Sequence, residues 1–462
     1  MKIIKVEAIV LRLPRVNAAA DGTQDTWLQS TAHSESDMNT PAESNSDCST
    51  KVRFNVLAYL CGVTFILYLD RMCIGKAAPF IQDELHLSDF QMGMVHAAFM
   101  LSYGLFEVVS GHLADRHGTR KVLTRIVIWW SMFTMLTGTA TGFTMLLITR
   151  FLFGAGEAGA LPNVTRIVDQ WFPTLARGRI RGFVHMPALV GGMIAPLMTA
   201  YLIAWIGWRW VFAVYGLVGV LWSIAFYRYF RDNPAEHTSV NPAELALIGP
   251  PPSHQGQPHL PLMPIARSFN VWLLGCVMIA GSSTVYLIFA WYPTYLEKLH
   301  GVSNVNSGWL NSFIMFGGAI GCLLGGWLVD VARKRVTHPR WEKSVVGTSA
   351  FFLAAVAMLA AAMTDSVEWK TVWLGITCMG IHMHASAWWG LNSAISGRHV
   401  AAVFGVINSM GALGGAVSQI LFGSLPRANW DHAFYVASGL LLLGALCWSQ
   451  VDARRAIFKL QH

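Results

Sequence analysis

Between residues 111 and 121 the chain reads Gly111-His112-Leu113-Ala114-Asp115-Arg116-His117-Gly118-Thr119-Arg120-Lys121. This short basic turn separates two apolar runs, residues 96–109 and 122–137. Such a turn keeps its cations on the cytoplasmic side of a membrane, and its glycines let two helices approach closely. A second copy, Gly325-Gly326-Trp327-Leu328-Val329-Asp330 followed by Arg333, Lys334 and Arg335, stands in the later half. An ordinary positive-inside loop is the alternative, but the duplicated pattern favours a membrane protein of two related halves.

The composition is that of a membrane protein. Apolar residues make up 54% of the 462 residues and charged residues 13%, which is far from the balance of a soluble globule. Because one span needs about twenty mostly apolar residues, we predict twelve spans, approximately at 54–76, 90–112, 122–141, 144–165, 183–205, 210–230, 270–295, 305–329, 344–363, 371–393, 400–422 and 432–451. The expected fold is an all-α membrane protein with twelve transmembrane helices in two six-helix halves.

The order of these spans predicts the division of the chain. We expect a tail at 1–52, a six-helix bundle at 53–231, a Pro- and His-rich cytoplasmic linker at 232–267, a second bundle at 268–455 and a tail at 456–462. Most of the 33 Lys and Arg residues then fall in cytoplasmic segments, so both chain ends are expected in the cytoplasm and the protein in the inner membrane. Outer loops hold only Lys76, Arg209, Lys298, Lys370 and Arg427. This asymmetry explains the net charge of +8 without any binding of nucleic acid.

The sequence offers no pattern for a metal site or for an enzyme. The seven cysteines are scattered, without a C-x-x-C pair. His382 and His384 are two residues apart on a predicted helix, so they do not share a face. We therefore expect no metal, no cofactor and no catalytic residue.

A charge within a membrane span is expensive and points to function. Asp70 and Arg71 lie in the first span, Arg150 and Glu157 in the fourth. The seven-residue spacing puts Arg150 and Glu157 on one face of a helix. Asp70 and Arg71 could instead form an ion pair at a helix end, and Arg150 could snorkel to the surface. Glu157 lies in the middle of its predicted span, and a desolvated carboxyl group near an arginine can take up and release a proton.

These residues and the basic turn resemble the major facilitator superfamily and, more narrowly, its anion:cation symporter family. The resemblance covers roughly residues 53–455 and is carried by Tyr68–Arg71, Ala77–Ile81, Leu87–Ser88, Gln91–Gly93, Arg150–Asn163 and Gly207–Trp210. Members carry organic anions such as hexuronates, aldonates, tartrate or phthalate-type acids, usually with protons. In galactonate-type members the acids matching Asp70 and Glu157 are protonation sites, and Arg150 matches the arginine paired with the fourth-helix acid. The resemblance therefore implies that Asp70, Glu157 and Arg150 couple transport to protons.

The resemblance also implies a substrate pocket and a gate. The predicted substrate-binding residues are Arg71, Tyr68, Tyr103, His185, Trp388, Trp389, Asn392 and Asn408. The predicted conformational gate comprises Gly111, Asp115, Arg116, Gly118, Arg120 and Asp330. The chain departs from the family at Ala188 and Ala412, where polar residues are expected, so the mechanism carries over better than the substrate. Trp388 and Trp389 suit a hydroxylated carbon chain, but could equally fill a helix interface.

The sequence therefore predicts proton-coupled symport of an organic anion, such as a hexuronate, aldonate or aldarate, by a monomer in the lipid bilayer. The alternatives are an antiporter or uniporter of another carboxylate, such as tartrate or an aromatic acid, and a transporter-like nutrient sensor. A weaker one is an enzyme fragment fused to a membrane anchor, because residues 1–25 resemble the opening strand of the enolase superfamily. Residues 26–50 are Ser-, Asp- and Asn-rich, which predicts a disordered tail or an artefact of the gene model.

Overall fold

The computed structural model describes residues 49–173, 176–249, 262–336, 338, 340–396, 399–427 and 430–458, without the side chains of residues 108–117, 262, 401 and 402. Most of the predicted N-terminal tail, including its enolase-like residues 1–25, therefore lies outside the described residues. So do residues 250–261 of the predicted linker and residues 459–462 at the C-terminal end.

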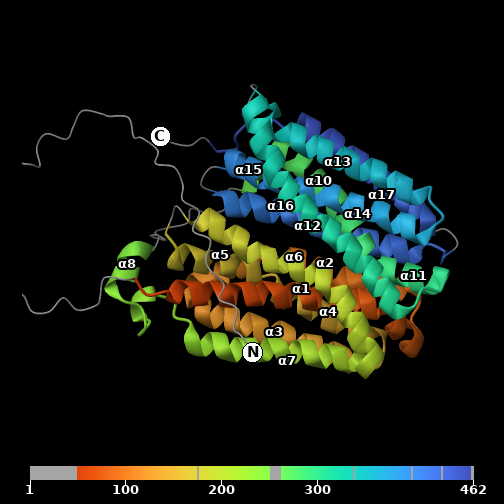
Figure 1. Cartoon of the computed structure of the whole chain (residues 1–462), viewed down its shortest axis with the longest axis horizontal. Coiled ribbons are helices and arrows are strands. Elements are labelled where there is room, and N and C mark those ends of the chain that lie inside the picture. The colour runs from red at the N-terminus through yellow and green to blue at the C-terminus, as the bar shows by residue number, and fades with distance from the viewer. Residues whose placement is uncertain are drawn as a thin grey trace, which may run out of the picture. The chain divides into compact units, whose positions relative to one another are not determined.

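Two groups of long helices pack side by side (Figure 1). The first is α1 (Val52–Leu85), α2 (Asp89–His117), α3 (Thr119–Gly138), α4 (Phe143–Glu157), α5 (Ala160–Trp171), α6 (Arg177–Ile206) and α7 (Trp208–Tyr229). The second is α10 (Phe269–Tyr286), the π-helix η2 (Leu287–Trp291), α11 (Tyr292–His300), α12 (Asn304–Arg335), α13 (Trp341–Ala362), α14 (Val367–Met383), α15 (Ala385–Ser396), α16 (Val400–Ser424) and α17 (Trp430–Gln450).

Helices stand at every predicted span position. Nine helical stretches in the described part of the chain are long and apolar enough to cross a membrane. The helices α2, α3 and the consecutive pair α14–α15 cover the remaining predicted positions. Three predicted spans are each built from consecutive pieces: α4 with α5, α10 with η2 and α11, and α14 with α15.

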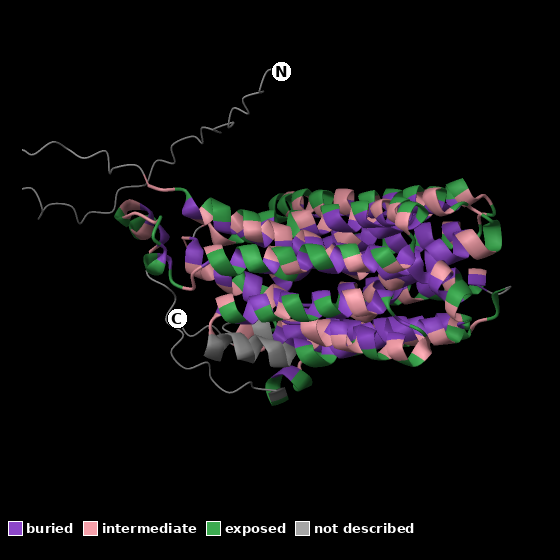
Figure 2. Ribbon diagram, turned by 90° about the horizontal axis from the view of Figure 1, so that it is seen from below, coloured by how far each residue is buried: buried purple, intermediate pink, exposed green. Residues whose placement is uncertain are grey.

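The outward faces of these helices are apolar. Figure 2 shows buried residues gathered between the helices and exposed ones along their outer sides. Many of the exposed residues are large and apolar, including Trp205 at 82% exposure, Leu323 at 71% and Leu446 at 65%. In water such a continuous apolar surface would drive aggregation, whereas lipid tails cover it. The chain is a multi-pass membrane protein.

The basic turn is shorter than the sequence predicts. Residues 111–117 continue α2 as helix, and the chain reverses at Gly118 alone, whose φ of 78° lies in the left-handed region. A Cβ atom at Gly118 would also stand 2.8 Å from a carboxylate oxygen of Asp232, so both backbone angle and space require glycine. The prediction of a turn across the whole motif was wrong, because basic residues mark the cytoplasmic side without breaking a helix. The second copy, at 325–330, likewise lies inside α12.

Two lysines that the sequence assigns to outer loops are buried in helices instead. Lys76 lies in α1 and pairs with Glu297 of α11, while its Nζ also donates to Ser307 of α12. Lys370 lies in α14, where its Nζ donates to Asp431 at 2.7 Å. Counting basic residues could not place them, because each is kept inside by a partner from another helix.

The predicted linker begins with two short helices, η1 (Pro234–Glu236) and α8 (Pro242–Ile248), and ends with α9 (Leu262–Arg267). The fully buried Glu244 of α8 accepts hydrogen bonds from the backbone N–H groups of Val52 at 3.2 Å and Arg53 at 3.1 Å. It also accepts a hydrogen bond from the hydroxyl group of Thr50. Since the first turn of a helix has no internal acceptor for its N–H groups, Glu244 caps α1 from the linker.

Removal of this cap should destabilise the protein. We expect Glu244→Ala to cost about 1–3 kcal/mol, because it leaves buried N–H donors of α1 without an acceptor. The measurement is thermal unfolding of the detergent-solubilised protein, with Glu236→Ala, at an exposed position of η1, as the control. Equal melting temperatures for the two variants would contradict the capping role.

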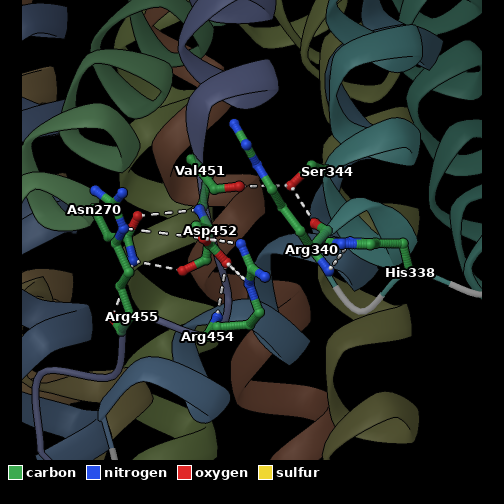
Figure 3. Close-up of polar contacts among 8 residues, drawn as sticks. All are labelled: Asn270, His338, Arg340, Ser344, Val451, Asp452, Arg454 and Arg455. Atoms are coloured by element: carbon green, nitrogen blue, oxygen red, sulfur yellow. Dashed lines mark hydrogen bonds and ion pairs between the residues drawn. The ribbon is translucent and has the colours of Figure 1, made fainter.

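The second group of helices is tied together where α10 and α13 begin and α17 ends (Figure 3). The Asn270 amide of α10 donates to the carbonyl oxygens of Asp452 and Arg455, at 2.8 and 3.1 Å. Ser344 of α13 donates to the carbonyl oxygen of Val451 at 2.9 Å. These bonds fix the segment after α17 against two other helices.

Candidate functional site

The four charged residues predicted to be functional meet in one buried cluster. Asp70 and Arg71 come from α1, Arg150 and Glu157 from α4. Arg71 donates from Nε to Glu157 Oε1 at 2.7 Å, and its Nη2 reaches the same oxygen. The family resemblance pairs Glu157 with Arg150, but this structure pairs it with Arg71. Seven residues advance a helix by about 10 Å, which separates Arg150 from Glu157 along α4. The guanidinium group of Arg71 on α1 lies closer to Glu157.

Aromatic rings surround both arginines. The guanidinium carbon of Arg71 lies 4.8 Å from the ring centre of Tyr103 and 5.4 Å from that of Tyr68. Arg150 lies 4.2 Å from the ring centre of Phe153. The Phe99 ring contacts both, at 5.3 Å from Arg71 and 5.4 Å from Arg150. Such rings stabilise a buried cation without neutralising its charge, so the cluster can still attract an anion.

Several buried polar atoms of this cluster form no hydrogen bond within the described residues. They are both carboxylate oxygens of Asp70, Oε2 of Glu157, Nε and Nη1 of Arg150, and Nε2 of His96. Buried polar groups are nearly always bonded, and exceptions commonly mark functional sites. The cluster therefore has unused capacity both to bind protons and to donate to an anion.

A small cavity opens on this cluster between the two groups of helices. Its lining residues are Arg71, Met72, Ile74, Gly75, His96, Phe99, Arg150, Tyr286, Phe289 and Ala290. The last three belong to α10 and η2, so both groups of helices contribute to the wall. A π-helix in this position is typical of a functional segment.

Sequence reasoning missed two members of this region. His96 of α2 is 6% exposed and lines the cavity. Glu107 of α2 is buried, and its Oε2 accepts a hydrogen bond of 2.6 Å from the amide of Asn408 on α16. Both lie inside the predicted span 90–112, so the rule that selected Glu157 would also have selected them. Asn408 thus meets a carboxyl group of the opposite group of helices.

The other predicted substrate-binding residues are placed differently. His185 of α6 lies close enough to His382 on α14 for the charges of the two side chains to interact. Trp388 and Trp389 pack on the ring of Phe404 of α16, at 5.0 and 4.6 Å between ring centres. Asn392 is fully buried and accepts a hydrogen bond from Ser396 of its own helix. These are contacts within and between α15 and α16, and the substrate-binding role of these residues stays a prediction.

Among the predicted gate residues that the structure describes, Arg120 bonds to its own group of helices and to the linker, and the gating role stays a prediction. Arg120 of α3 donates from Nε and Nη2 to the carbonyl oxygen of Tyr227 on α7, at 3.0 and 2.6 Å. Its backbone N–H donates to Asp232 at 2.8 Å, and Asp330 is exposed on α12. The side chains of Asp115 and Arg116, and the surroundings of Gly111, lie outside the described residues.

Three ion pairs join the two groups of helices near the ends of α1, α2 and α11 that the predicted topology places outside. Lys76 pairs with Glu297, Lys298 with Asp83, and Arg427 with Asp89 at 2.8 Å. Close by, the backbone of α1 at Gly75 touches the carbonyl oxygen of Phe289 in η2 so tightly that a Cβ atom would overlap it. These contacts join the two groups of helices on that side of the cavity.

Comparison with known proteins agrees with this geometry. Residues 60–419 match the family model described as the Major Facilitator Superfamily. The probable sulfoacetate transporter SauU of Cupriavidus necator is 31% identical over 404 residues, covering 86% of this chain and 93% of its own. The D-galactonate transporter of Escherichia coli is 27% identical, covering 86% and 94%. An inward-facing bacterial homologue of the human lysosomal transporter Spinster has a similar fold, with a TM-score of 0.72, 19% identity, and coverage of 88% and 98%.

Proposed function

Because the chain belongs to the major facilitator superfamily, we propose that it is a secondary active transporter in which an inward flow of protons drives uptake of an organic anion. We place it in the inner membrane as a monomer, with both ends in the cytoplasm. Its fold and its relatives are those of membrane transporters, not of enzymes. The observation that carries the proposal is the buried bond between Arg71 and Glu157 beside the cavity between the halves.

This bond supplies a coupling mechanism. While Glu157 is ionised it occupies the guanidinium of Arg71, and the buried pair is electrically balanced. A proton on Glu157 removes that charge, and Arg71 is then free to bind the carboxylate of a substrate through two parallel hydrogen bonds. Asp70 is a second proton acceptor in the same cluster. Proton and anion thus enter together, because each makes the other's binding favourable.

We propose an organic acid of the sugar-acid class as the substrate: a hexuronate, aldonate or aldarate. Relatives named for D-galactonate and sulfoacetate support an anionic group recognised by Arg71. A neutral hexose lacks the group that would bind a guanidinium and should not compete.

The deciding experiment is uptake into proteoliposomes. Galactonate, galactarate, glucuronate and sulfoacetate are offered with and without an inward proton gradient, with a protonophore as control. Accumulation that requires the gradient supports symport. Equilibration without accumulation would establish the uniporter alternative, and a requirement for internal substrate would establish the antiporter.

Arg71→Lys should weaken substrate binding by about tenfold or more although the charge is kept, because an ammonium cannot reproduce the bidentate geometry. The measurement is the KM for uptake, compared with that of Arg179→Lys at an exposed cytoplasmic position. A KM equal to that of the wild type would make Arg71 a structural residue.

A further inference from the structure

We propose that the cavity is an anion site with two ends, in which Arg71 holds one acidic group of the substrate and Arg150 holds a second. Within the organic acids proposed above, dianions are then preferred over monoanions. The inference rests on the proposed function, since it takes Arg71 as the first binding group.

The first observation is the state of Arg150. Its side chain is 1% exposed, lines the same cavity as Arg71, and has two nitrogen atoms, Nε and Nη1, that donate to no acceptor in the described part of the chain. A buried guanidinium is ordinarily paired and fully bonded, because an unbalanced charge is costly away from water. Glu157, the carboxylate expected to balance it, is bonded to Arg71 instead. An anion in the cavity would satisfy Arg150.

The second observation is His96, which lies on α2 and lines the cavity with Arg150. Its Nε2 is buried and forms no hydrogen bond among the described residues. Its ring meets Trp291 of η2 edge-on, with 5.7 Å between ring centres. A neutral imidazole can donate one N–H, so His96 adds a donor at the end of the cavity where Arg150 lies.

The spacing of the two ends favours a short molecule. One ring, Phe99, contacts both guanidinium groups, so the arginines are held on a common support. Between them the wall is mainly apolar, with Met72, Ile74, Phe289 and Ala290, and Tyr286 supplies a hydroxyl group. The cavity is small in this conformation, so a carbon chain with an acidic group at each end, which suits an apolar wall, requires the two groups of helices to move apart.

Charge balance leads to the same class. When Asp70 and Glu157 both carry protons, Arg71 and Arg150 leave two positive charges in the buried cluster. A dianion neutralises both, whereas a monoanion leaves one uncompensated at a cost in low dielectric. The other titratable groups facing the cluster are Cys73, His96, Glu107, Tyr68, Tyr103, Tyr215 and Tyr286. Glu107 is bonded to Asn408 and lies toward Arg71, not Arg150.

The test uses pairs of probes in which one carboxylate is exchanged for a hydroxymethyl group. These pairs are sulfoacetate with isethionate, succinate with 4-hydroxybutyrate, and galactarate with galactonate. Binding to the purified full-length protein is measured by thermal shift and calorimetry, without any gradient. We expect the dianion to bind at least about tenfold more tightly than its monoanion in the two short pairs. Arg150→Gln should remove this difference and leave the affinity for the monoanions within about threefold.

Arg179→Gln, at an exposed position, is the matched control and should keep the preference. Equal binding of both members of every pair by the wild type would overturn the proposal, as would an equal loss for both members in Arg150→Gln.

If the Arg150→Gln variant does not fold, His96→Gln must reduce the preference for dianions in its place. Stabilisation by chloride alone that depends on Arg150, without a preference for dianions, would assign the subsite to a free inorganic anion. Failure of proton-driven uptake would contradict the proposed function. The comparison of dianion and monoanion binding, which needs no gradient, would still test the two-ended anion site.

Discussion

Glu157→Gln should abolish accumulation of the substrate while exchange of substrate across the membrane continues. Glutamine keeps the shape of the protonated acid but cannot release a proton, so the cycle loses the ion whose gradient drives it. The internal concentration should then only equal the external one, an accumulation ratio of about 1 at every imposed pH gradient. Exchange should persist, because the variant imitates the state in which Arg71 is available to an anion.

Two measurements distinguish this loss of proton coupling from misfolding or a general loss of transport. Counterflow of labelled substrate reports the remaining exchange, and Glu236→Gln, at an exposed position of η1, should behave as the wild type. Full accumulation by Glu157→Gln under a pH gradient alone would show that the coupling proton binds elsewhere, with Asp70 and Glu107 the next residues to change.

Gly75→Ala should reduce the rate of uptake by about tenfold or more, because it obstructs closure of the outer side. The added methyl group would overlap the carbonyl oxygen of Phe289, and overpacking of this kind costs about 1–3 kcal/mol. That cost falls only on the state in which α1 and η2 touch. The open state should therefore gain population, and the carrier should return slowly through the closed one.

Gly439→Ala on α17 is the matched control, since a Cβ atom there meets no neighbouring atom within 4 Å. It should transport at the rate of the wild type. A Gly75→Ala variant that is equally fast would mean that the contact with Phe289 is not made during transport.

The sequence allowed the architecture to be predicted because its signals are repeated and long. Apolar runs of about twenty residues gave every span position, and the two copies of the glycine-rich motif indicated the halves. The sequence did not show where the turn begins and ends, since residues 112–117 are as compatible with helix as with a loop.

The site was predictable in its members but not in its pairing. A charged residue inside an apolar run is visible in the sequence, and by that rule Asp70, Arg71, Arg150 and Glu157 were all found. Which arginine bonds Glu157 depends on how close α1 lies to α4, and no spacing along the chain encodes that distance. His96 and Glu107 also lie inside a predicted span, so the same rule applied to every ionisable residue would have found them.

The π-helix η2 has a consequence for the outer ion pairs. Its wider turn holds one residue more than an α-helical turn would. If these residues returned to α-helical hydrogen bonding, the register of everything beyond would advance by one residue, which is a rotation of about 100° and a shift of about 1.5 Å. Glu297 and Lys298 lie on α11, directly beyond η2, and would swing away from Lys76 and Asp83 together. A change of one hydrogen-bond register could thus act as a latch that releases two ion pairs in a single step.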